Sequence, residues 1–345
     1  MLSALFRRPT TDAEPTGPAA TSAVTEGPPV LDARGAADPA AWAAEHRRAL
    51  RDLVAEHGAV TVRGLDLRTP EDVVPVLHRL ADPATEREAF APRDTYAEGL
   101  YSSSVWPPNQ PMCMHHELSY TTRCPGLLLF ACLRAPEEGG ATALADSSAV
   151  LADLPTDVTE RFARQGWLLT RSYNDEIGAT LHQSFGTDDH AAIDTYCRDH
   201  GIDRSWQPDG SLHTRQHRNA VVGHPLSGRP CWFNQIAFLN EWTLAPEVRE
   251  FLVEEYGSDN LPFNTRYGNG DPVSPDTVDR INEAYEAHTV RRPWHAGELM
   301  LVDNIATAHS REAYEGTRDV VVGMGDPVSP ARSLRLATDT GRAAA

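Results

Sequence analysis

Short apolar segments bounded by turn residues are numerous after about residue 125, and they limit the fold of this chain more than any other feature. Six of them favour strands, at residues 127–133, 167–173, 220–224, 231–236, 298–302 and 319–324. They do not alternate regularly with helices, and no Gly-x-Gly-x-x-Gly motif occurs, which argues against a doubly wound nucleotide-binding fold. Short strands with long insertions predict an α+β protein: a double-stranded β-helix (jelly roll) core with flanking helices and a long insertion.

Capping residues mark several helix ends. Asp38 and Pro39 open a helix that ends just before Gly58, and the Thr-Pro pair at 69–70 opens another by the same rule. Further elements are expected as a strand at 59–63 and helices at 187–200, 246–256 and 274–288.

The chain shows no internal repeat and no segment typical of a domain linker. We therefore expect a single domain over residues 30–335. Residues 1–29 are mostly rich in Pro, Thr, Ala and Gly, which predicts a disordered N-terminal tail. Residues 336–345 are expected to form a loose C-terminal tail.

Composition excludes several classes of protein. The 345 residues are 41% hydrophobic and 23% charged, as in an ordinary soluble domain, and the net charge of −18 argues against nucleic acid and anionic membranes as partners. No apolar run reaches membrane-spanning length. The five cysteines are odd in number and lack a Cys-x-x-Cys pair, which disfavours a disulfide scaffold or zinc ribbon and favours a cytoplasmic protein.

The most informative motif is His115-His116-Glu117. On a strand, residues at i and i+2 share a face, so His115 and Glu117 would point together and His116 away. A later histidine, His309, could complete a site of two histidines and one carboxylate, the facial triad of non-heme Fe(II) oxygenases. A structural His-Glu pair is the simpler alternative. A zinc-protease helix is excluded, because Tyr120 stands where the second histidine would be.

Several further segments, taken in order, resemble one enzyme family. They are residues 114–120, 135–142, 224–228, 232–235 and 297–318, within a match that runs from about residue 95 to 326. Together they resemble the TauD/TfdA-like Fe(II)/2-oxoglutarate-dependent oxygenases, and most closely the SyrP-like branch. The resemblance implies Fe(II) as cofactor, 2-oxoglutarate as co-substrate and O2 as oxidant.

The resemblance also implies residue roles. His115, Glu117 and His309 match the iron ligands, while Thr142 and Arg318 match the residues that hold 2-oxoglutarate. A guanidinium suits a carboxylate because it donates two parallel hydrogen bonds.

Three positions bear on 2-oxoglutarate binding, on the substrate and on the type of reaction. Arg311 is the nearer alternative to Arg318 as the 2-oxoglutarate residue. Val322 occupies the position where TauD has a sulfonate-binding arginine, which disfavours a taurine-like substrate. Glu117 argues against halogenation, because the halogenases of the superfamily have a small residue there.

Substrate residues are less clear from the sequence. Arg171 and Asn174 lie in the insertion, and Asn234 follows the predicted strand residue Trp232, so these three are candidates. Asp303 and Asn304 could orient His309 or its strand, or could merely cap a turn.

The expected reaction is hydroxylation of an unactivated C–H bond of an amino acid or amino-acid-derived small molecule in secondary metabolism, with the substrate free or presented on a carrier protein. A related desaturase or cyclase, a non-catalytic jelly-roll binding protein and a metal-dependent hydrolase are the alternatives. The oligomeric state is left open.

Overall fold

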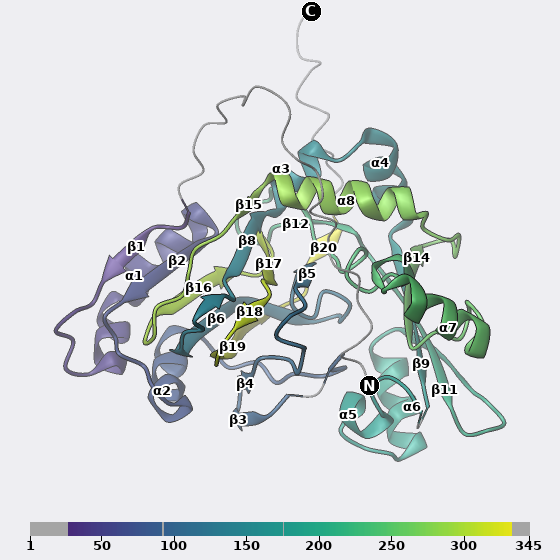
Figure 1. Ribbon diagram of the computed structural model, residues 1–345, viewed down its shortest axis with the longest axis horizontal. Coiled ribbons are helices and arrows are strands. Elements are labelled where there is room, and N and C mark those ends of the chain that lie inside the picture. Colours follow the sequence, from purple (N-terminus) through teal and green to yellow (C-terminus); the bar gives the residue numbers. More distant parts are fainter. Residues whose placement is uncertain (1–26, 92, 175, 333–345) are drawn as a thin grey trace, which may run out of the picture.

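The first helix begins and ends, and the second helix begins, as their capping residues predict. The structure, a computed structural model, describes residues 27–91, 93–174 and 176–332 (Figure 1). Helix α1 (Pro39–His57) begins after Asp38, whose carboxylate accepts hydrogen bonds from two backbone N–H groups of the first turn. It ends at Gly58, whose φ of 75° suits glycine. Helix α2 (Pro70–Leu80) begins with a capping box.

The core contains one large, mostly antiparallel sheet. Its strands, in spatial order, are β1 (Val30–Asp32), β2 (Ala59–Arg63), β16 (Leu299–Asp303), β6 (Cys124–Arg134), β19 (Asp319–Val328), β4 (Leu100–Ser102) and β3 (Thr95–Ala97). Only the β1–β2 pair is parallel.

A smaller antiparallel sheet packs against the large one. Its strands, in spatial order, are β15 (Thr289–Val290), β8 (Thr142–Asp146), β17 (Thr307–Arg311) and β5 (Met112–His115). Beside it, β18 (Tyr314–Glu315) pairs with β7 (Glu138–Gly139).

Eight strands divide between these two sheets in the pattern of a double-stranded β-helix. Strands β4, β6, β16 and β19 lie in the large sheet, and β5, β8, β15 and β17 lie in the small one. Along the chain, β4 to β8 alternate between the sheets, and so do β15 to β19. The predicted jelly-roll core is therefore confirmed.

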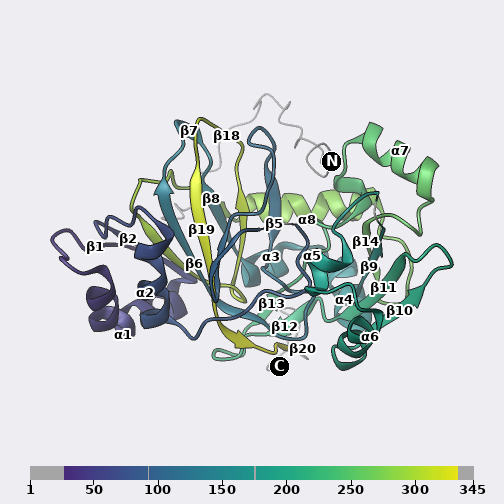
Figure 2. The same cartoon turned by 90° about the horizontal axis from the view of Figure 1, so that it is seen from below.

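The middle of the large sheet is buried on both faces, because the central strands β6 and β16 are apolar at nearly every position. On β6, Leu128 and Phe130 pack in the cluster shared with the small sheet. Their neighbours Leu129 and Ala131 point the other way, into a second cluster with residues of α1 and α2. Figure 2 shows these two helices on the outer side of the large sheet.

A long insertion separates β8 from β15, and it lies on the other side of the core from α1 and α2 (Figures 1 and 2). Its helices are α3 (Ser147–Asp153), α4 (Thr156–Gln165), α5 (Leu181–Phe185), α6 (His190–Asp199), the short 3-10 helix η2 (Glu241–Thr243), α7 (Pro246–Tyr256) and α8 (Pro275–Ala287). Its main sheet runs β10 (Ile202–Trp206), β11 (Leu212–Arg218), β9 (Trp167–Tyr173) and β14 (Phe263–Tyr267).

Residues 224–229 form the turn between two antiparallel strands, β12 (Val221–Gly223) and β13 (Pro230–Trp232), and β20 (Ala331–Arg332) pairs with β12. The strand predicted at 231–236 is too long. It ends at Trp232 because the Asn234 side chain accepts a hydrogen bond from the N–H of Ile236 and turns the chain.

The predicted tails lie largely outside the described residues, which exclude 1–26 and 333–345. Residues 27–29 are described, and the carbonyl of Pro28 accepts a hydrogen bond from Arg292. The five cysteines form no disulfide. Among the helices that the structure describes, none is both long and apolar enough to cross a membrane.

Candidate iron and 2-oxoglutarate site

His115 and His309 meet because their strands are neighbours. His115 ends β5, and the register of β5 with β17 places it directly opposite His309. Side chains of directly paired residues in antiparallel strands share a face. The two imidazole rings accordingly lie with their centres 4.3 Å apart.

Glu117 reaches the same place from a turn, and not from the strand that the sequence predicts. Strand β5 ends at His115, and Leu118 has a left-handed backbone with φ of 54°. The side chain of Asn304 fixes this turn: its Oδ1 accepts from the N–H of Glu117 at 2.8 Å, and its Nδ2 donates to the Glu117 carbonyl at 2.9 Å. His116 points away, as predicted, towards the carbonyls of Asn304 and Trp232.

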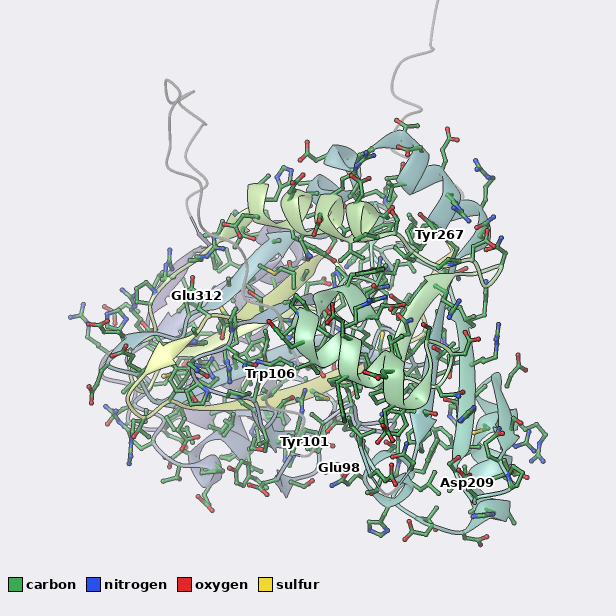
Figure 3. The ribbon with its side chains drawn as sticks, turned by 45° about the vertical axis from the view of Figure 1, so that its right-hand side comes forward. Glu98, Tyr101, Trp106, Asp209, Tyr267 and Glu312 are labelled. Atoms are coloured by element: carbon green, nitrogen blue, oxygen red, sulfur yellow. The ribbon has the colours of Figure 1, made fainter. Side chains whose placement is uncertain are left out.

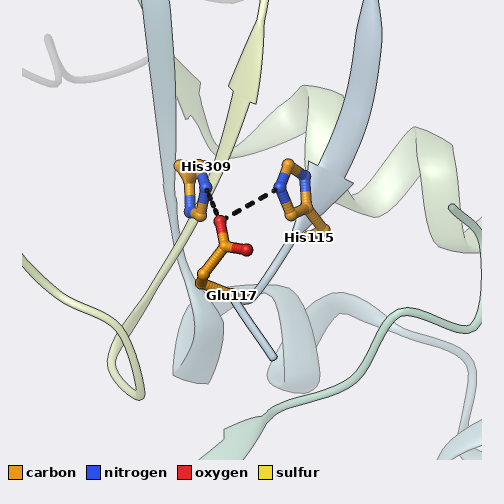
Figure 4. A group of neighbouring side chains, drawn as sticks. All are labelled: His115, Glu117 and His309. Atoms are coloured by element: carbon orange, nitrogen blue, oxygen red, sulfur yellow. Dashed lines mark ion pairs between the residues drawn. The ribbon is translucent and has the colours of Figure 1, made fainter. Parts of the chain in front are cut away.

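The three side chains converge around one small space (Figure 4). Oε2 of Glu117 lies 3.6 Å from Nε2 of His309 and 4.0 Å from Nε2 of His115. One ligand atom from each residue lies within 4.8 Å of the other two, and all three residues are buried. Two segments that are distant in the sequence thus bring these three side chains together.

The protonation of these groups fits a metal site. Nδ1 of His115 lies 2.8 Å from the Cys113 carbonyl, so this nitrogen carries the hydrogen and Nε2 presents its lone pair. Burial, followed by the charge of His309, lowers the pKa of His115 to about 3. Burial alone would raise the pKa of Glu117, but the positive charge of Arg93 and the two histidines hold it well below its usual range.

Two neutral imidazoles and a carboxylate are a donor set for a divalent first-row metal, and three protein ligands leave further coordination positions open. The chemistry of this donor set therefore fits iron(II).

A second group of residues lies along the same two strands. The register of β17 with β8 pairs His309 with Leu144 and Arg311 with Thr142. Thr142 therefore lies on the same face as His309, about 7 Å farther along the strands at roughly 3.3 Å per residue.

Thr142 and Arg318 form the predicted pair. Oγ1 of Thr142 accepts hydrogen bonds from Nη2 of Arg318 at 3.2 Å and from the indole of Trp294 at 3.1 Å. Nε of Arg318 donates to the carbonyl of Gly140 at 2.8 Å. Burial, followed by the charge of Arg311, lowers the pKa of Arg318 to about 10, so the group remains a cation.

Two consecutive glycines allow this close packing. Gly139 and Gly140 both have φ of 67°. A Cβ atom on Gly139 would lie 2.3 Å from the carbonyl of Ala313, and one on Gly140 would lie 3.1 Å from Arg318. Within the described residues, Arg318 has no carboxylate partner. Its guanidinium is therefore available to pair with an anionic ligand.

Arg311, the alternative in the sequence, has both of its Nη atoms committed elsewhere, while its Nε is buried without a partner among the described residues. Its Nη2 donates to the carbonyls of Pro107 at 2.6 Å and Gln110 at 2.8 Å, and its Nη1 donates to that of Trp106 at 3.3 Å. Arg311 thus fastens the loop between β4 and β5 to the strand that carries His309.

The three substrate candidates do not join the cluster. Arg171 donates to the carbonyls of Glu88 and Ala89, both at 3.1 Å. The side chain of Asn174 accepts from two N–H groups in its own turn, and that of Asn234 bonds to Ala220 and Ile236. Each has a local structural partner, so none of them is a good substrate residue.

An aromatic wall and a buried arginine were not found from the sequence. Phe238 stacks on His115, with ring centres 4.8 Å apart, and Phe90 and Trp106 pack against Phe238. Figure 3 shows Trp106 near the middle of the molecule, between the core strands and the insertion. Arg93 bonds to Glu117. These residues come from loops with no distinctive spacing.

A jelly-roll core that holds two histidines and a carboxylate, near an arginine with no carboxylate partner among the described residues, defines a class, the Fe(II)/2-oxoglutarate-dependent oxygenases. Residues 23–324 match the family described as taurine catabolism dioxygenase TauD, TfdA family. The chain therefore belongs to the TauD/TfdA family, and it is an iron- and 2-oxoglutarate-dependent oxygenase.

The chain is also similar to individual known proteins. The chain is 31% identical over 280 residues to the dapdiamide synthesis protein DdaC of Enterobacter agglomerans, covering 81% of this chain and 85% of DdaC. It is 26% identical over 287 residues to a clavaminate synthase-like protein of Arabidopsis thaliana, covering 80% and 83% of the two chains. Among solved structures, PvcB of Pseudomonas aeruginosa aligns with a TM-score of 0.48 and 15% identity, over 84% of this chain and 82% of PvcB.

Proposed function

We propose that the chain hydroxylates an unactivated C–H bond of an amino acid or an amino-acid-derived small molecule, in the synthesis of a secondary metabolite. In this proposal His115, Glu117 and His309 hold the iron. Thr142 and Arg318 hold the distal carboxylate of 2-oxoglutarate. The bound iron would couple oxidative decarboxylation of 2-oxoglutarate by O2 to oxidation of the substrate, releasing succinate and CO2.

The convergence of the three ligand atoms within 4.8 Å of one another is the observation that carries this proposal. The spacing between His309 on β17 and Thr142 on β8 supports the proposed role of Thr142 and Arg318. A keto acid that chelates iron must extend several ångströms to its far carboxylate. The buried guanidinium of Arg318 and the hydroxyl of Thr142 lie at about that distance from the histidine and can bind this carboxylate.

Glu117 supports hydroxylation over halogenation. The carboxylate is present, its backbone is fixed by Asn304, and one of its oxygens is held by Arg93, so no room is left for a halide in its place. Desaturation or cyclisation would use the same residues, and analysis of the product distinguishes them.

The substrate proposal has two supports. DdaC, the relative with 31% identity, is named for dapdiamide synthesis, which favours a biosynthetic role. The aromatic wall of Phe238, Phe90 and Trp106 lies beside His115 and suits the carbon chain of an organic substrate. Val322 is buried between strands of the large sheet, where it replaces the sulfonate-binding arginine expected for taurine.

Succinate release tests the proposal. The purified protein, loaded with Fe(II) and 2-oxoglutarate in air, is assayed against a panel of amino acids, both free and loaded on carrier proteins, with mass analysis of the products. One panel member should raise succinate release at least tenfold and gain one oxygen atom, and His309→Ala should abolish both. If no amino acid raises succinate above the substrate-free level although iron and 2-oxoglutarate bind, the amino-acid assignment is wrong.

A further inference from the structure

A buried arginine holds the oxygen of Glu117 that faces away from the histidines. Nη2 of Arg93 donates to Oε1 of Glu117 at 2.9 Å, while Oε2 faces His115 and His309. Nε of Arg93 lies 3.6 Å from Oε1 of Glu86. The side chains of Arg93, Glu117 and Glu86 are each only 7–8% exposed.

This contact separates the two oxygens of the carboxylate by function. A carboxylate with both oxygens free can chelate a metal through both. With Oε1 bound to a guanidinium, Oε2 alone is left to act as a ligand, because a charge-assisted hydrogen bond in a buried site is strong and directional. The orientation of Glu117 about its last bond is thereby fixed.

The segment that carries Arg93 is itself fastened. The carbonyl of Glu88 accepts from the hydroxyl of Tyr120 at 3.0 Å and from Nη1 of Arg171 at 3.1 Å. The carboxylate of Glu88 accepts from the hydroxyl of Tyr196 at 2.9 Å and from the side chain of Gln216. Arg93 therefore extends from an anchored loop, which suits a group that must hold another residue in place.

We propose that Arg93 is a positioning residue for the metal ligand Glu117. It holds Oε1 so that Glu117 binds iron through Oε2 alone, which keeps the other coordination positions for 2-oxoglutarate and O2. This inference rests on the proposed role of Glu117 as a ligand. Nη1 of Arg93 is buried without a hydrogen-bond partner among the described residues, so the guanidinium has capacity left for an acceptor on a bound molecule.

Anaerobic titration with Co(II) tests the inference without turnover. The d–d absorption of Co(II) reports both affinity and coordination number. In Arg93→Met the dissociation constant should rise about 10- to 100-fold, the range seen when residues that orient metal ligands are removed, and the spectrum should change. Arg93→Lys should recover part of the affinity, because an ammonium can hold one oxygen but lacks the fork of guanidinium.

Loss of Arg93 also leaves two buried carboxylates without their partner, so the single variant could unfold. The double variant Arg93→Met/Glu86→Gln removes that repulsion and keeps the test valid. Arg249→Met is a matched control, since Arg249 also pairs with a largely buried carboxylate, that of Glu241 at 2.7 Å, but does not contact the cluster. It should bind Co(II) within about threefold of the wild-type protein.

The possible failures are distinguishable. Glu117→Ala should weaken Co(II) binding at least 100-fold, and if it binds as well as the wild type, the proposed ligand role of Glu117 is wrong. If Glu117→Ala is defective but Arg93→Met/Glu86→Gln shows wild-type affinity and spectrum, the ligand role stands and the inference about Arg93 is overturned.

Discussion

The hydroxyl of Thr142 and Nη2 of Arg318 lie 3.2 Å apart, although Thr142 begins β8 of the small sheet and Arg318 lies just before β19 of the large sheet. Removal of the cation in Arg318→Met should cost about 1.5–3 kcal/mol of the free energy of 2-oxoglutarate binding. The dissociation constant should therefore rise about 10- to 100-fold. Thr142→Val should weaken binding less, because it removes a neutral group. Anaerobic equilibrium titration of the iron-loaded protein with 2-oxoglutarate measures both.

Arg311→Met tests the alternative assignment in the same titration. Arg311 donates to three backbone carbonyls of the β4–β5 loop, so this variant should lower stability more than it lowers 2-oxoglutarate affinity. A larger affinity loss in Arg311→Met than in Arg318→Met would exchange the roles of the two arginines.

Asn304 is expected to matter for both folding and metal binding. Its side chain donates to the carbonyls of Glu117 and Pro125 and accepts from the N–H of Glu117. Asn304→Ala leaves these buried groups unpaired and should lower the free energy of unfolding by about 2–4 kcal/mol. Urea denaturation of the metal-free protein measures this, and a change below about 0.5 kcal/mol would show that the turn holds Glu117 without Asn304.

Arg171 should behave as a structural residue. Arg171→Met leaves the carbonyls of Glu88 and Ala89 without a buried donor, so we expect a loss of about 2–4 kcal/mol in stability. Once folded at low temperature, the variant should keep kcat/KM for the substrate within about threefold. A tenfold fall in kcat/KM with unchanged stability would return Arg171 to the substrate site.

Glu88 should make stability depend on pH. Burial raises its pKa, against the opposing hydrogen bond from Tyr196 and the charge of Arg218. The unfolded chain then loses this proton at a lower pH than the folded protein, so wild-type stability falls relative to Glu88→Gln as pH rises above the usual range of glutamate. Denaturation of both metal-free proteins from about pH 5 to 8 measures the free energy of unfolding of each. The advantage of Glu88→Gln over the wild type should grow with pH, and it would instead shrink if the pKa of Glu88 were lowered in the folded protein.

Much of the fold followed from local sequence signals. Helix α1 begins and ends where Asp38 and Gly58 predict, and β9 and α7 occupy the predicted ranges, since caps and alternating apolar residues act locally. Strands β8 and β17 were missed because they are short and rich in Ala, Thr and Ser. Their strand structure depends on pairing with each other and with β5.

The site was predictable only where a motif carries it. His115, Glu117 and His309 could be predicted to meet because the chemistry of a metal requires all three. Arg93 could not, because a single arginine in a loop has no pattern, and its role depends on how the loop is fastened. Nor could the sequence show that the guanidinium of Arg171 donates to backbone carbonyls, because such contacts leave no pattern in the sequence.

The central claim is that His115, Glu117 and His309 hold one iron(II) to which 2-oxoglutarate binds. Anaerobic absorption spectroscopy tests it most directly, since a keto acid chelated to iron(II) gives a weak visible charge-transfer band. We predict that the band appears with one equivalent each of iron and 2-oxoglutarate, and that it is absent in a folded His309→Ala variant. A band of full strength in that variant, or no band in the iron-loaded wild-type protein, would contradict the claim.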